Sequence, residues 1–138
     1  MMDNQTNPND LINTIYLGDR ACKSILIDGW NELVKIQVDS ISRVRGETWN
    51  YYLDEDIENG FIVFSGIQSI QFEPSGFILN DSINYLKVEQ TDIEDHFLFL
   101  FSAYSANENN DYQEVVIKFI AREIYLEDPL HPNVKITK

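Results

Sequence analysis

Apolar residues recur at every second position through most of this chain, and a period of two is the side-chain spacing on one face of a β-strand. Val34, Ile36 and Val38 alternate with polar residues, which predicts a strand with one buried and one wet face. The segment 97–101 is apolar throughout, so both of its faces are predicted to be buried in the centre of a sheet. The pattern therefore indicates a chain built mainly from β-strands.

Turn residues divide this pattern into separate strands. Asp28-Gly29-Trp30-Asn31 predicts a hairpin, and Asn59-Gly60 predicts a second turn because both residues tolerate positive φ. The remaining predicted strands span residues 61–64, 69–72, 83–89, 97–101 and 113–126. The last of these is long enough to cross between two sheets or to bend near Ala121.

Helix-start chemistry is found at the N-terminal end, where Pro8 begins a partial apolar stripe that reaches Tyr16 and ends at Gly18. The fold class predicted is mainly β: an antiparallel sandwich or open barrel of about seven strands with one short N-terminal helix. A helix packed on a single sheet is the competing arrangement. At 138 residues, we expect a single domain over 1–138, with flexible ends at 1–7 and 129–138.

Acidic residues dominate the charge of the chain, which has 23 Asp and Glu residues, ten Lys and Arg residues and a net charge of −13. Between Gly46 and Ile117 there are 14 acidic residues and one basic residue, Lys87, so the whole net charge falls in the middle of the sequence. A field of one sign repels nucleic acid and anionic membranes and speeds encounters with basic proteins. We therefore expect a basic protein partner and neither a nucleic-acid nor a membrane partner.

The location predicted for the protein is the cytoplasm. The one cysteine, Cys22, excludes an intramolecular disulfide and a cysteine-based zinc site. The first ten residues are polar and lack the basic and apolar regions of a signal peptide. The longest apolar run, 97–101, is too short to span a bilayer.

Patterns typical of catalysis or metal binding are weak in this sequence. The acidic run from Asp54 resembles a calcium loop, but its glycine falls at position seven and Ser65 at position twelve, where an EF-hand needs glycine at six and glutamate at twelve. The two histidines, His96 and His131, accompany no nucleophile motif. We predict no enzymatic activity, no metal site and no cofactor.

One stretch combines aromatic and acidic side chains in the manner of a protein contact surface, where aromatic anchors and a carboxylate rim favour a basic partner. The predicted partner-binding residues are Trp49, Tyr51, Tyr52, Asp54, Glu55, Asp56 and Glu58. The alternative is that Trp49 and Tyr51 simply fill the core from one face of a strand.

Four runs carry a resemblance to known proteins: residues 14–20, 28–30, 61–67 and 121–127. They look like a family of small bacterial domains of unknown function, and the likeness covers nearly the whole chain. In size, charge and strand order the chain is also similar to the small acidic immunity proteins that bacteria pair with secreted toxins. The resemblance implies a masking role against a toxin and supplies no site residues.

Three functions follow as hypotheses. The leading one is an acidic non-enzymatic binding protein, in its sharpest form an immunity-type protein that masks a basic toxin or nuclease. The first alternative is a small apolar ligand binder with an aromatic-lined interior formed by Phe61, Phe64, Phe97, Phe99 and Phe101. The second is a carboxylate-dependent hydrolase, which needs an Asp or Glu of raised pKa in a cleft. We expect a monomer or a weak homodimer formed through an edge strand.

Overall fold

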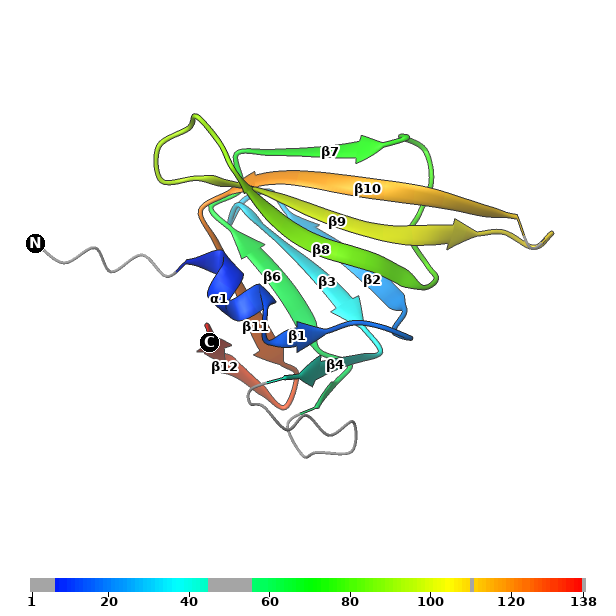
Figure 1. The fold of residues 1–138 in the computed structure, drawn as a ribbon, viewed down its shortest axis with the longest axis horizontal. Coiled ribbons are helices and arrows are strands. Elements are labelled where there is room, and N and C mark those ends of the chain that lie inside the picture. The colour runs from blue at the N-terminus through cyan, green and yellow to red at the C-terminus, as the bar shows by residue number, and fades with distance from the viewer. Residues whose placement is uncertain (1–6, 45–55, 110, 138) are drawn as a thin grey trace, which may run out of the picture.

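The computed structural model describes residues 7–44, 56–109 and 111–137 of the chain (Figure 1). This part of the chain forms one short helix and twelve strands, and every strand pair is antiparallel. The elements are α1 (Pro8–Ile12), β1 (Ile15–Tyr16), β2 (Cys22–Asp28), β3 (Leu33–Val38), β4 (Ser40–Arg43), β5 (Ile57–Glu58), β6 (Phe61–Ser65), β7 (Ser69–Glu73), β8 (Ile83–Gln90), β9 (Phe97–Ala106), β10 (Tyr112–Ala121), β11 (Glu123–Asp128) and β12 (His131–Ile136). The prediction of a mainly β antiparallel fold with one short N-terminal helix is confirmed.

Two large sheets pack face to face and enclose the core. One has the strand order β7-β10-β9-β8 and the other the order β12-β11-β6-β3-β2. Phe64 on β6 stacks on Phe119 of β10 with ring centroids 4.3 Å apart, and it lies 5.3 Å from the ring of Phe99 on β9. All three side chains have no exposed surface. Aromatic contact between the sheets therefore forms the centre of an open sandwich.

The chain passes from one large sheet to the other at Arg122. Strand β10 ends at Ala121 beside β7 and β9, while β11 begins at Glu123 beside β6. The Arg122 amide N–H donates to the carbonyl of Ser65 at 3.0 Å, which ties the crossing point to the end of β6. The prediction that 113–126 crosses two sheets or bends near Ala121 is thereby confirmed.

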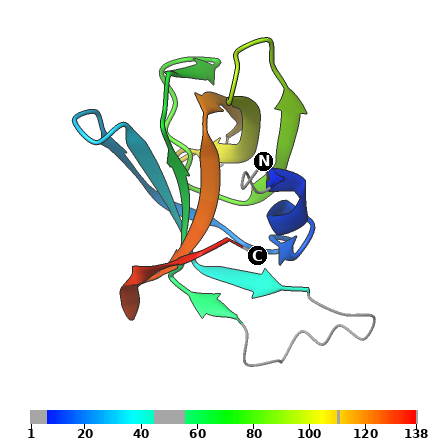
Figure 2. The same ribbon diagram turned by 90° about the vertical axis from the view of Figure 1, so that its left-hand side faces the viewer.

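A third, small sheet of order β1-β4-β5 and the helix α1 cover one side of the sandwich (Figure 2). Leu11 of α1 is 1% exposed, and the helix contacts β8 and β11. The expectation that the helix continues to Tyr16 is wrong, because Ile15 and Tyr16 pair with Arg43 and Ser42 as strand β1. Backbone pairing with β4 outweighs the apolar stripe that favoured a helix there.

The structure confirms some of the remaining predictions about strands and chain ends and corrects others. The β2–β3 hairpin is confirmed, with Ile25 opposite Ile36. Strand β9 is central, as predicted, but Leu98 and Leu100 are only half-buried, because the outer face of its sheet carries no further layer within the described residues. The segment 129–138, expected to be a flexible end, contains β12, which pairs with β11. Within the described residues, no helix has the length and apolar character needed to cross a membrane.

Candidate functional site

The predicted contact surface falls partly outside the part of the chain that the structure describes. Trp49, Tyr51, Tyr52, Asp54 and Glu55 belong to residues 45–55, which are not described. The other two predicted residues are Asp56 and Glu58. Half-buried Asp56 precedes the short strand β5, and exposed Glu58 is its last residue.

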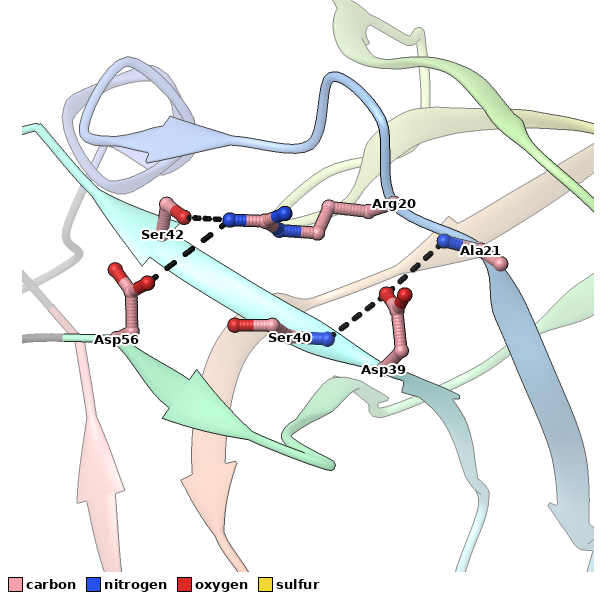
Figure 3. A network of polar contacts seen from close by, with 6 residues as sticks. All are labelled: Arg20, Ala21, Asp39, Ser40, Ser42 and Asp56. Carbon is pink, nitrogen blue, oxygen red and sulfur yellow. Dashed lines mark hydrogen bonds and ion pairs between the residues drawn. The ribbon is translucent and has the colours of Figure 1, made fainter. Parts of the chain in front are cut away.

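Asp56 takes part in a polar network at the small sheet (Figure 3). Its Oδ2 lies 3.9 Å from Nη2 of Arg20, and the same nitrogen donates to Oγ of the buried Ser42 at 2.6 Å. Nearby, Oδ1 of Asp39 accepts the amide N–H groups of Ala21 and Ser40 at 3.0 and 2.9 Å. These contacts join β4 and β5 to the start of β2, so Asp56 stabilises the fold locally.

The exposed carboxylates lie at several ends of the molecule. Asp92, Glu94 and Asp95 occupy the β8–β9 loop, whereas Glu108 and Asp111 flank the β9–β10 turn at the opposite end of the same sheet (Figure 1). Clustering in the sequence therefore does not become a single acidic face among the described residues.

Several basic residues are already paired with carboxylates. Lys35 contacts Glu127 at 2.9 Å, and Lys118 contacts Glu73 at 2.9 Å. A further pair places Lys135 Nζ 3.6 Å from Glu123. Local pairing leaves few positive groups to offset the remaining acidic surface.

An apolar groove opens along the side of the sandwich opposite α1. Strand β2 is the outer strand of the five-stranded sheet, and β7 is the outer strand of the four-stranded sheet. Figure 2 shows the β2–β3 hairpin and β7 diverging on this side. The groove has a volume of about 530 Å³, which lies within the range of ligand sites. It is lined by Lys23, Ser24, Ile25, Ile27, Phe72, Gly76, Phe77, Ile78, Leu79 and Asn80.

Large apolar side chains of the groove are exposed to solvent. Ile27 on β2 is 57% exposed, and Phe77 and Ile78 in the β7–β8 connection are 45% and 76% exposed. Sequence reasoning missed this site because it placed strands at 69–72 and 83–89 and assigned no role to the residues between them. The signal available was the apolar run 77–79, outside any predicted strand.

The free edge of β2 runs along the groove. At the start of the strand, the Cys22 amide N–H donates to the carbonyl of Asp81 at 3.0 Å. From Lys23 to Asp28, β2 pairs with β3 on one side and, within the described residues, with no strand on the other. The groove therefore combines apolar side chains with unpaired backbone groups of an edge strand.

An aspartate lies at each end of this edge. Asp28 ends β2, and its Oδ2 accepts from the Asn31 side-chain amide at 2.8 Å while Oδ1 accepts the Asn31 backbone N–H at 3.0 Å. These hydrogen bonds stabilise the ionised carboxylate and so lower the pKa of Asp28. Half-buried Asp81 lies beside the start of the strand.

The five phenylalanines predicted to line a ligand-binding interior do not share one environment. Phe64, Phe99 and Phe101 have no exposed surface, and the rings of Phe64 and Phe99 contact each other. Phe97 lies 6.2 Å from Phe99, and Phe61 lies on the other face of β6, where Lys35 approaches its ring. The groove between β2 and β7 is a separate site that uses none of these five phenylalanines.

Another polar cluster lies on the outer face of the four-stranded sheet. Ser102 Oγ donates to Glu114 Oε2 at 2.7 Å, and Asn84 Nδ2 donates to the same oxygen at 2.8 Å. These hydrogen bonds lower the pKa of Glu114, which is the opposite direction to that needed by a general acid.

Two further observations concern reactive and metal-binding groups. Burial raises the pKa of Cys22 to about 11, which keeps its thiol protonated. Within the described residues, no group of three or more His, Cys, Asp or Glu side chains is placed to hold a metal ion.

The fold and the groove define a small antiparallel β-sandwich domain with one open apolar side. The chain belongs to a family of unknown function, DUF6258, whose model matches residues 6–138. Comparison with curated proteins and with solved structures found no match.

Proposed function

We propose that this chain is a non-enzymatic binding domain for a basic protein, and that an immunity-type role, in which it masks a basic toxin or nuclease, is the most specific form of that function. The observation that carries the proposal is an exposed apolar groove in a domain of net charge −13. Monomeric proteins rarely expose large apolar patches without an interaction to serve. The surrounding charge selects the sign of the partner.

The charge acts at long range and the groove acts at contact. Carboxylates at both ends of the four-stranded sheet attract a cationic protein from many directions, which raises the rate of encounter. Apolar burial in the groove then slows dissociation, because the hydrophobic contribution grows with the area removed from water. Salt should therefore weaken association mainly through its rate.

Affinity capture at two salt concentrations tests this function. The tagged full chain is incubated with native lysate at about 20 mM and about 300 mM salt, between which the Debye length falls several-fold. We expect a retained protein with a pI above about 9 at low salt and much less of it at high salt. Retention of neutral or acidic proteins, equal retention at both salts, or no retention would contradict the proposal.

Neutralised variants test whether the carboxylates at each end of the four-stranded sheet contribute to long-range attraction. Asp92→Asn, Glu94→Gln and Asp95→Asn together remove three charges from the β8–β9 loop, while Glu108→Gln with Asp111→Asn removes two from the β9–β10 turn. All five residues are exposed, so we expect both variants to fold normally. Each should slow association without changing dissociation appreciably.

A further inference from the structure

We propose that the β2–β7 groove binds an extended segment of the partner protein by strand addition to β2, and that this segment alternates apolar and basic residues. The inference rests on the proposed function and names the part of the partner that the groove recognises. Strand addition uses main-chain hydrogen bonds for affinity and alternate side-chain pockets for specificity.

The backbone of β2 supplies the first element of this recognition. Its outer edge is engaged at Cys22 by the carbonyl of Asp81 and is unpaired from Lys23 to Asp28 within the described chain. Six residues of strand extend over about 20 Å, at roughly 3.4 Å per residue. An added strand of similar length satisfies the outward N–H and C=O groups of β2.

The groove supplies the second element. Ile25 and Ile27 occupy alternate positions on β2 and face Phe72, Phe77 and Ile78 across the groove. Because side chains of an added strand also alternate, every second residue of the bound segment enters this apolar space and its neighbours point to solvent. About three apolar side chains fit along the length of the edge, at roughly 7 Å spacing.

The charge near the groove indicates which residues of the bound segment alternate with its apolar residues. Asp28 and Asp81 lie at the two ends of the edge, so their negative charges favour lysine or arginine beside the apolar positions of the bound segment. Among the residues that the structure describes, Lys23 is the one basic residue lining the groove, and its Nζ donates to Asn59 Oδ1 at 2.6 Å. A second copy of this chain would bring another −13 charge and the same carboxylates to the edge, which disfavours a homodimer there.

Defined peptides test the inference on the whole chain. The probe is a capped heptapeptide of sequence Lys-Ile-Lys-Val-Lys-Ile-Lys, titrated into isotopically labelled protein while backbone amide shifts are followed. The first control has the same composition with its apolar residues contiguous at one end. The second control carries N-methyl groups on alternate residues, which remove backbone donors without altering charge. We expect the probe to shift β2 and 76–80 amides, and each control to bind at least about tenfold more weakly.

Two matched protein variants separate contact from charge. Ile27→Lys places a positive charge in the groove, whereas Leu26→Lys places the same charge on the opposite face of the same strand. The two side chains are similarly exposed, at 57% and 50%, so neither variant should unfold the domain. We expect Ile27→Lys to weaken the probe at least about tenfold and Leu26→Lys to weaken it by less than about threefold.

Several results would overturn the inference. Equal loss in both variants, or equal binding of the contiguous control, would mean that charge alone attracts the peptide. Binding of the uncharged fluorescent dye Nile red in the groove, without binding of the peptide, would indicate a small apolar ligand. Self-association that Ile27→Lys abolishes would indicate a second copy. If capture of the partner stays salt-sensitive but is unaffected by Ile27→Lys, the groove inference fails, while the binding of a basic protein through acidic attraction stands. If capture shows no salt dependence, the proposed function itself fails.

Discussion

Replacing Phe64 with alanine tests whether the aromatic contact between the two large sheets holds the sandwich together. Phe64 has no exposed surface, and its ring stacks on Phe119 at 4.3 Å with an interplanar angle of 17°. Truncating a buried phenylalanine typically costs about 3 to 5 kcal/mol through lost burial and the cavity left behind. Since domains of this size are stable by roughly 5 to 15 kcal/mol, Phe64→Ala should remove a large share of the free energy of unfolding.

The ring contact itself is measured by a double-mutant cycle with Phe64→Leu and Phe119→Leu. The pair should be coupled by about 0.5 to 1.5 kcal/mol beyond its buried area. Urea unfolding followed by intrinsic fluorescence gives the free energies, and Tyr112→Ala on β10, where the side chain is 60% exposed, should cost less than about 1 kcal/mol. A Phe64→Ala cost no larger than this control, or a coupling indistinguishable from zero, would refute the packing described.

Further perturbations give equally direct expectations. Burial raises the pKa of Cys22 to about 11, while an unfolded thiol titrates near 9, so unfolding releases a proton between these pH values and the free energy of unfolding should fall as pH rises from about 9 to 11. Cys22→Ala should flatten that fall when urea unfolding is measured as a function of pH. An unchanged slope would contradict the raised pKa of Cys22. Gly66→Ala should destabilise the domain by about 1 kcal/mol or more, because Gly66 has φ +65° and an added Cβ would lie 2.8 Å from the Arg122 side chain. Gly29→Ala is the control: an added Cβ would meet nothing within 4 Å, so its thermal melt should be nearly that of wild type. Lys35→Met should lower the free energy of unfolding by about 1 to 3 kcal/mol, because it removes the 2.9 Å partner of Glu127, a residue that is 8% exposed. Urea unfolding that gives the stability of wild type would show that the pair contributes nothing.

Much of the strand pattern is predictable from residues alone. The alternation at Val34, Ile36 and Val38 correctly identifies the buried face of β3, because one face of a half-buried strand must be apolar. The Asn59-Gly60 turn is confirmed by the positive φ of 56° at Asn59, a conformation that asparagine tolerates better than most residues. Local chemistry of this kind acts within a few residues and needs no knowledge of the rest of the chain.

Elements that depend on distant pairing were mispredicted. Ile15 and Tyr16 continue an apolar stripe that favours a helix, yet they form β1 because β4, more than 20 residues later in the chain, offers them a partner. His131 lies in a segment expected to be flexible, but β12 forms there because β11 presents its outer edge. The sequence around each residue contains no sign of these partners.

The candidate site illustrates the same limit. Acidic residues that are close in sequence, such as Asp95 and Glu108, are separated by the length of β9 and lie at opposite ends of one sheet. The groove arises from Ile27 on one sheet and Phe72 on the other, which only the strand order brings together. Charge patterning in the sequence leads to the proposal of a basic partner, while the proposed location of the contact depends on the fold.

Capture of a partner by three immobilised forms of the full chain tests the acidic attraction and the groove contact in one experiment. Wild type, Ile27→Lys and Leu26→Lys are each incubated with the same native lysate at about 20 mM and about 300 mM salt. We expect wild type and Leu26→Lys to retain a basic protein at low salt and Ile27→Lys to lose most of it. At high salt, all three forms should lose it. A partner retained equally by all three forms at both salt concentrations would contradict both the acidic steering and the groove contact.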